Sequence, residues 1–255
     1  MTTLTSDAQL SAYLLRLGDN ALVLGQRLSQ WTGRAPIVEE DLALTNVALD
    51  LIGQARLWLA YAGEAEGAGR DEDDLAYFRD ARAFCNVLLV EQPNGDYGQT
   101  LARQFLFDTW HYHLLRALAD SSGERIAGIA QKAVREVAYH VRRSGDWVVR
   151  LGDGTELSRA RMQASIDDLW PYTGELFRSD DLDAEMQRRG VGTQLEALHG
   201  PWLEHVARVL GEATLSVPKD GWMHSGGKTG RHSEHLGYLL AEMQSVRRSV
   251  PGERW

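Results

Sequence analysis

The sequence is poor in several features that define large classes of proteins. Cys85 is the only cysteine among 255 residues, so no disulfide can form within the chain and a reducing compartment is expected. No apolar run approaches the roughly 18 residues that span a bilayer. The opening stretch MTTLTSDAQL lacks the charged and then apolar pattern of a secretory leader. We therefore expect a cytoplasmic protein without a membrane segment.

Positive charge is also scarce, because 27 lysines and arginines face 36 acidic residues and no basic block occurs. The net charge of −9 disfavours binding to nucleic acid or to an anionic membrane, since both need a positive surface. The remaining composition, 44% hydrophobic and 25% charged, is ordinary for a globular protein. A chain of this length can bury a sizeable core, and we expect a single domain over residues 1–255.

Alternating strand patterns are missing, whereas apolar residues recur at the three- and four-residue spacing of one helix face. This spacing is clear from Leu10 to Trp31, before Gly33 and Pro36 end the helix. Pro171 should kink or split a later helix. Short connections favour antiparallel neighbours, so the pattern predicts an all-α four-helix bundle with additional C-terminal helices. The long helices are predicted at 10–32, 39–62, 96–119 and 124–151, and the others near 74–90, 156–177, 193–214 and 233–249.

A bundle of this kind can carry a carboxylate-bridged di-iron or di-manganese site. Such a site takes one Glu from each of two helices and a Glu-x-x-His from each of the other two. The first predicted helix has no Glu, and its only acid is Asp19. No histidine precedes His111, so the second helix offers no Glu-x-x-His. Only the third and fourth helices place an acid and a histidine one turn apart, as Asp108 with His111 and Glu136 with His140.

These two pairs also have plainer interpretations, which we favour. Asp108 and His111 are expected to form a buried or half-buried acid–imidazole hydrogen bond rather than a metal site. Glu136 and His140 are expected to form an i,i+4 helix pair. His113 lies about 140° around the helix from Asp108, so it cannot join that pair.

A polar stripe on the second predicted helix leaves two interpretations open. Asn46, Asp50 and Gln54 lie four residues apart among apolar neighbours. They predict either a buried polar network or a surface that faces a partner chain.

Two motifs near the C-terminus match no known chemistry closely. GGKTG (226–230) lacks the spacing of a phosphate-binding loop and is interpreted as a surface turn, although Lys228 could touch an anionic ligand. HSEH (232–235) lacks the histidine spacing of a zinc protease. The terminal Trp255 suggests a docked tail.

Several longer segments are too unusual to be generic helix, and they run from near residue 14 to the C-terminus. They are LRLGDNALVLGQRL, DLALTNVALDLIGQAR, LLVEQPNGDY, ARQFLFDTWH, RLGDGTELS and GRHSEHLGYLLAEMQ. In these segments the chain resembles the structural C subunits of bacterial phenylacetyl-CoA epoxidases, also called phenylacetate-CoA oxygenases. The resemblance implies a ferritin-like fold. It also implies membership of a multicomponent monooxygenase that converts the ring of phenylacetyl-CoA to an epoxide.

The resemblance implies where the cofactors of such a complex lie. The di-iron site lies in a related A subunit, which also binds the thioester, while a reductase with flavin and an iron–sulfur cluster supplies electrons from NADPH. Leu51 and Gln54 stand where the catalytic relative has its Glu-x-x-His, and leucine cannot bind iron. We therefore expect no catalytic residue, no bound metal and no other cofactor in this chain. The candidates for a degenerate di-iron cavity are Asp50, Gln54, Asp108, His111, Glu136 and His140.

The function predicted from these observations is that of a non-catalytic subunit in aerobic phenylacetate catabolism. Its partners would be the catalytic A subunit, which it scaffolds, and the other oxygenase components, with a possible homodimer when isolated. We expect Asp108 and His111 to lie in a hydrogen-bonded cluster with Asp50, Gln54 or Glu136.

Two alternative functions stay open at this point. One is a self-sufficient di-iron or di-manganese oxidase with an atypical ligand set, made of Asp50, the pair Asp108 and His111, and the pair Glu136 and His140. The other is a helical module that binds an acyl-CoA through basic residues such as Lys228 and Arg231. The sequence identifies no substrate-binding residue.

Overall fold

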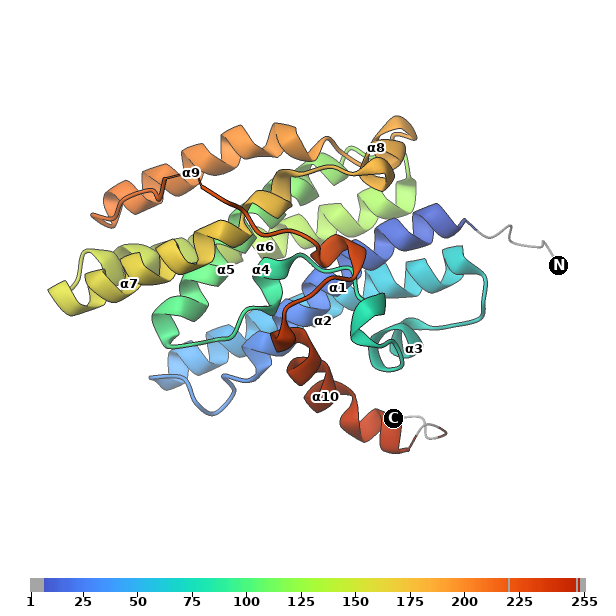
Figure 1. The fold of residues 1–255 in the computed structure, drawn as a ribbon, viewed down its shortest axis with the longest axis horizontal. Coiled ribbons are helices and arrows are strands. Elements are labelled where there is room, and N and C mark those ends of the chain that lie inside the picture. The colour runs from blue at the N-terminus through green and yellow to red at the C-terminus, as the bar shows by residue number, and fades with distance from the viewer. Residues whose placement is uncertain (1–6, 220, 251, 253–255) are drawn as a thin grey trace. The chain divides into compact units, whose positions relative to one another are not determined.

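The computed structural model describes residues 7–219, 221–250 and 252 (Figure 1). These residues contain helices and no strand, which confirms the predicted all-α class. The chain divides into two compact units, the first made of residues 1–92 and 226–255 and the second of residues 93–225. The single domain predicted over the whole chain stays a prediction. The docked tail expected at Trp255 lies outside the described residues.

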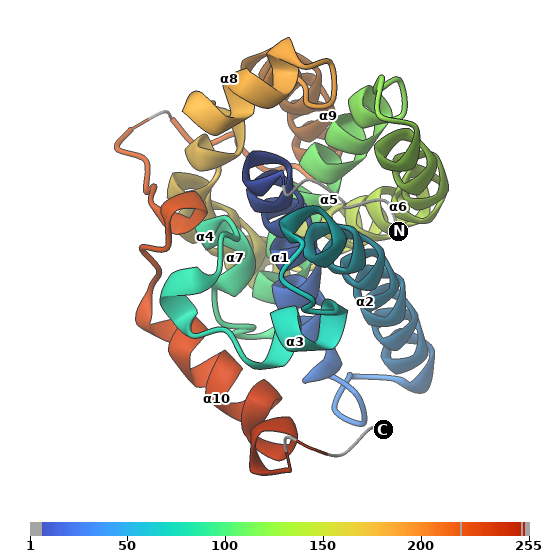
Figure 2. The same cartoon turned by 90° about the vertical axis from the view of Figure 1, so that its right-hand side faces the viewer.

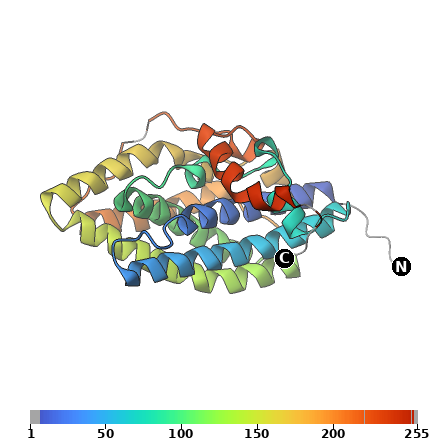
Figure 3. The ribbon, with the colours of Figure 1, turned by 90° about the horizontal axis from the view of Figure 1, so that it is seen from below.

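The first unit is built on two long helices that run side by side in opposite directions (Figure 3). The first of them begins where the Asp7 carboxylate accepts a hydrogen bond from the Leu10 N–H at 3.0 Å, the usual arrangement of an N-cap. This helix is buried along most of its length. The three other helices of the unit lie around it, and each of them contacts either this helix or one of its neighbours (Figure 2). The helices of this unit are α1 (Ala8–Ser29), α2 (Val38–Glu66), α3 (Glu72–Tyr77), α4 (Leu88–Glu91) and α10 (Glu234–Ser249).

The end of α2 differs from the prediction. The helix predicted at 39–62 continues through Gly63 to Glu66, and its C-cap is Gly67, which has a left-handed φ of 72°. Gly63 serves close packing instead, since a Cβ there would lie 2.1 Å from the carbonyl oxygen of Arg70. A glycine can end a helix or admit a close neighbour, and sequence spacing alone does not distinguish these uses.

The helix predicted near 74–90 is wrong, because this stretch is broken into α3, a short 3₁₀ turn and α4. The backbone N–H of Cys85 donates to the Asp19 carboxylate at 2.8 Å. The backbone N–H of Val87 donates to the Asn20 side-chain oxygen at 2.8 Å. Side chains of α1 thus take the hydrogen bonds that a continuous helix would give to carbonyls four residues earlier.

The GGKTG segment is more than the surface turn that we expected. Gly226 and Gly227 are buried, and a Cβ on Gly227 would lie 2.2 Å from the carbonyl oxygen of Asn86. Gly230 has a φ of +76°, and its Cβ would lie 2.3 Å from the carbonyl oxygen of Arg82. These glycines let the chain pass directly against the backbone before α10, which only residues without a Cβ allow.

The second unit also begins with a pair of long antiparallel helices, and both match the predicted ranges within one residue. Pro171 lies in a 3₁₀ segment directly after the third helix, which confirms that it splits the predicted helix. Two buried indole N–H groups donate hydrogen bonds to backbone carbonyls. Trp110 donates to the Leu176 carbonyl and Trp202 to the Leu106 carbonyl, both at 3.0 Å. The helices are α5 (Tyr97–Leu118), α6 (Glu124–Gly152), α7 (Glu156–Leu169), α8 (Asp181–Arg188) and α9 (His199–Glu212).

The short helix α8 was missed because eight residues with few apolar members set no helical period. The sequence feature that marks this helix lies at its N-terminus, where Asp180 and Asp183 form a capping box. Among the helices that the structure describes, none has the length and apolar character that a membrane crossing requires.

Candidate functional site

Asp108 lies fully buried in α5 and is held by two neutral side chains. The Gln104 amide, one turn earlier, donates to its Oδ1 at 2.6 Å. The Ser144 hydroxyl of α6 lies 3.2 Å from its Oδ2 and also donates to the carbonyl oxygen of His140 at 2.8 Å. A hydroxyl has one hydrogen, so Ser144 shares it between these two acceptors or accepts from a protonated Asp108.

The electrostatics of the cluster favour a partly protonated carboxyl. Burial raises the pKa of Asp108 to about 6, and it outweighs the opposing effects of His140, Gln104, Ser144 and Arg143. Desolvation disfavours the charged form of an acid, and neutral donors compensate for it only in part. Asp108 therefore changes its charge near pH 6 instead of near the ordinary value for aspartate.

His111 follows Asp108 by one turn of α5 and is also buried. Burial, followed by the nearby His140, lowers the pKa of His111 to about 3, so its imidazole is neutral at physiological pH. Its Nδ1 has no hydrogen-bond partner among the described residues. No hydrogen bond joins it to Asp108 in that part of the chain, so the expected acid–imidazole bond is not formed.

The other predicted members of the cavity are placed differently. His140 is buried on α6 and lies close enough to lower the pKa values of Asp108 and His111. Glu136, one turn earlier on α6, is half-buried. We expected Asp50, Gln54 or Glu136 beside Asp108, but its hydrogen bonds come from Gln104 and Ser144. No pattern in the sequence indicates either partner, since a glutamine and a serine on separate helices belong to no motif.

The polar stripe of α2 does not follow one face. Asn46 is exposed, Asp50 is half-buried and Gln54 is buried. Residues four apart advance about 40° around a helix at each step, so the stripe turns from solvent into the core. Leu51 is fully buried beside it. The sequence left open a buried polar network and a surface that faces a partner chain. Only the first part of the stripe, at Asn46 and Asp50, is accessible enough to face a partner.

A second buried acid, Asp19 of α1, is neutralised by an arginine that the sequence did not single out. The Arg79 guanidinium donates from Nη1 to Asp19 Oδ2 at 3.0 Å and from Nη2 to Oδ1, across 60 residues of sequence. Arg79 also lies 4.2 Å from the centre of the Phe84 ring. Both side chains are almost wholly buried, so the guanidinium supplies the positive charge that this carboxylate needs in the core.

Glu91 of α4 forms a third buried cluster and explains the HSEH motif. Its carboxylate accepts from the Asn86 amide at 2.9 Å and from the Ser233 N–H at 2.6 Å. His232 lies between this carboxylate, 2.7 Å from Nδ1, and the Phe84 carbonyl oxygen, 2.8 Å from Nε2. Carbonyl and carboxylate oxygens both accept, and both ring nitrogens can donate only in the protonated imidazole, so this geometry favours the positively charged form of His232.

The pKa of His232 follows from these contacts. Burial lowers it, but the hydrogen bonds to Glu91 and to the Phe84 carbonyl outweigh burial, and the net pKa is raised. A raised folded-state pKa contributes stability that is complete below the unfolded-state value of about 6.5. This contribution is lost as the pH rises through the folded-state pKa.

We therefore expect the free energy of unfolding to fall more at alkaline pH in the native protein than in a His232→Gln variant. Urea unfolding of both proteins between pH 6 and pH 9 measures this difference. The other titrating groups are present in both proteins, so their contributions cancel when the two profiles are subtracted. Parallel pH profiles would contradict the charged assignment of His232.

The donor set does not fit a carboxylate-bridged metal pair. Among the described residues, no three His, Cys, Asp or Glu side chains are gathered where they could hold a metal ion. The carboxylate of Asp19 is committed to Arg79, and that of Asp108 to Gln104 and Ser144. A di-iron site needs several free carboxylates that point to one centre.

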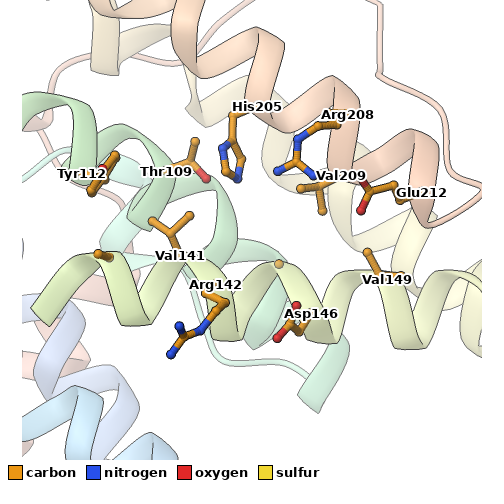
Figure 4. Close-up of a pocket in the computed structure, with 12 residues that line it drawn as sticks. Thr109, Tyr112, Val141, Arg142, Asp146, Val149, His205, Arg208, Val209 and Glu212 are labelled. Atoms are coloured by element: carbon orange, nitrogen blue, oxygen red, sulfur yellow. Dashed lines mark hydrogen bonds and ion pairs between the residues drawn. The ribbon is translucent and has the colours of Figure 1, made fainter. Parts of the chain in front are cut away.

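The second unit also contains a pocket of about 410 Å³ between α5, α6 and α9 (Figure 4). Arg208 on its rim pairs with Glu212 at 2.7 Å, and burial followed by Arg208 lowers the pKa of His205. The lining carries two arginines and two acids, so it has no net preference for an anion. It is formed by Thr109, Tyr112, Ala138, Val141, Arg142, Gly145, Asp146, Val149, His205, Arg208, Val209 and Glu212.

Fold and site together define a ferritin-like all-α protein whose buried acids are satisfied by protein groups. The family model of the phenylacetic acid catabolic proteins matches residues 1–255, and the chain belongs to this family. It is 49% identical over 247 residues to the C subunit of the 1,2-phenylacetyl-CoA epoxidase of Escherichia coli (strain K12). That match covers 97% of this chain and 99% of the relative. The resemblance predicted from the sequence is thereby confirmed.

Proposed function

We propose that this chain is the non-catalytic structural subunit of a multicomponent monooxygenase that epoxidises the aromatic ring of phenylacetyl-CoA. It serves aerobic phenylacetate catabolism in the cytoplasm by binding and stabilising the catalytic A subunit. The di-iron centre belongs to that partner, and the flavin and the iron–sulfur cluster belong to the reductase. This chain itself holds no metal and no other cofactor.

The observation that carries the proposal is the way in which the buried acids are satisfied. Asp19 faces a guanidinium and Asp108 faces an amide and a hydroxyl, so neither carboxylate is left for an iron ion. Leu51, which the resemblance places at a ligand position, is buried and apolar. The match to the Escherichia coli relative, itself named as a C subunit, extends over nearly the whole chain and supports the same role here.

Metal analysis of the purified chain tests the non-catalytic part of the proposal. We expect an iron content far below one ion per chain, with the catalytic A subunit purified in the same way as the positive control. About two irons per chain would contradict the proposal and favour a self-sufficient oxidase. A pull-down with the A subunit tests the scaffold part, and a chain that fails to bind it would contradict that part.

The acyl-CoA alternative gains no support from the position of Lys228. Lys228 is half-buried in the segment packed against the backbone near Asn86, and the pocket of the second unit has a balanced charge. Calorimetry of the isolated chain with phenylacetyl-CoA should therefore detect no binding.

A further inference from the structure

The outer face of α2 is unusually apolar for a helix that already packs along α1. α2 and α6 have the same length, 29 residues each, yet they meet solvent differently. The described outer face of α6 carries one exposed large apolar side chain, Tyr139. On α2, Val38 is 70% exposed and Leu42 and Leu49 are each 60% exposed. We call Val38, Leu42, Leu49 and Ile52 the α2 stripe.

The geometry of the α2 stripe is that of a helix–helix contact. At 100° per residue its four side chains fall within an arc of about 80°. Leu42 and Leu49 lie seven residues apart and Ile52 follows three later, which is the spacing of a seam between two packed helices. Exposed apolar surface of this continuity marks an interaction site rather than scattered surface residues.

Gly53 gives the same face a second property. It lies in the middle of α2, and a Cβ placed on it would meet no heavy atom within 4 Å. A glycine inside a helix lowers helix stability, and no close contact in the described part of the chain requires it at that position. Next to the α2 stripe, it lets the backbone of another helix approach closely.

The charges at the two ends of α2 select the kind of partner. Its first turn carries Glu39, Glu40 and Asp41, and Glu64 lies exposed near its last turn. A second copy of this chain whose α2 ran parallel to the first would bring these first-turn acids against one another. A chain with an apolar helix flanked by lysine or arginine has the complementary charge.

We infer that the α2 stripe is the docking surface for a helix of the catalytic A subunit, one with an apolar seam and basic residues at its ends. This inference rests on the proposed function, which supplies the partner. The stripe supplies the apolar contact, Gly53 the close approach, and the acids the negative charge that a basic partner helix complements.

The test measures the affinity of purified variants for the purified A subunit by calorimetry. Leu42→Glu and Leu49→Glu are each expected to raise Kd by at least about tenfold, since each places a charge in the centre of the contact. Leu157→Glu on α7 is the matched control, because Leu157 is 62% exposed and lies outside the stripe. It should leave Kd unchanged, and all three variants should keep the circular dichroism and urea midpoint of the native chain.

The outcomes separate the two proposals. If the native chain binds the A subunit and the Leu42→Glu/Leu49→Glu double variant binds it equally well, the stripe inference is overturned and the scaffold function stands. If the native chain does not bind the A subunit, both are overturned. A dimer of the native chain that only the double variant abolishes, with binding to the A subunit intact, would make a second copy the occupant and would overturn the inference.

Charge complementarity is tested by salt and by a neutral variant. Raising the salt concentration should weaken binding to the A subunit, and a Glu39→Gln variant should show a smaller salt dependence. An unchanged salt dependence would overturn the assignment of a basic partner helix.

Discussion

Arg79→Met is expected to lower the free energy of unfolding by about 3–5 kcal/mol, because it leaves the Asp19 carboxylate buried without its counter-charge. The pair is almost wholly inaccessible to solvent, so water cannot replace the guanidinium. Arg79 also donates to the Ala83 carbonyl at 2.9 Å, and that acceptor loses its partner too. Urea unfolding at neutral pH measures the loss.

Two further variants make the result specific to the buried pair. Adding Asp19→Leu to Arg79→Met should recover much of the lost stability, since it removes the unpaired charge and fills the space with an apolar side chain. Arg208→Met breaks an exposed pair with Glu212 and should cost no more than about 1 kcal/mol. A loss equally small for Arg79→Met would show that the Asp19 carboxylate has another source of stabilisation.

Asp108→Asn is expected to gain stability relative to the native protein as the pH rises from 4 to 7. The folded-state pKa of Asp108 is raised by burial to about 6, so its contribution is present below the unfolded-state value of about 3.9 and is lost through pH 6. This difference between the folded-state and unfolded-state pKa values corresponds to about 3 kcal/mol. Asparagine avoids this loss, because its amide reproduces the hydrogen bonds of a protonated carboxyl to Gln104 and Ser144.

His111 makes the same variant informative at acidic pH. Its folded-state pKa is lowered to about 3 by burial, so its contribution is present above the unfolded-state value of about 6.5 and is lost as the pH falls. In the native protein the slopes of Asp108 and His111 oppose each other between about pH 4 and pH 6. The Asp108→Asn variant should therefore lose stability on acidification more steeply than the native protein. Urea unfolding at pH 4, 5, 6 and 7 checks this, and parallel profiles would refute it.

The long helices could be predicted because their physical cause is local. An apolar side chain at every third or fourth residue is enough to identify α1, α5 and α6, and caps such as Asp96 before α5 lie next to the helices they begin. The break between α3 and α4 could not be predicted in this way. It depends on Asp19 and Asn20, which bind backbone groups 66 and 67 residues later in the chain.

What the sequence by itself determined is the fold class and the family. It also shows, without coordinates, that residue 51 offers no carboxylate and residue 54 no imidazole, because these residues are Leu51 and Gln54. Only the tertiary structure decided how the remaining acids are satisfied, with Asp19 beside Arg79 and Asp108 beside Ser144. The reason is physical. The residue type determines which hydrogen bonds and ion pairs a side chain can make, whereas its burial and the partners that the fold brings near it determine which of them it does make.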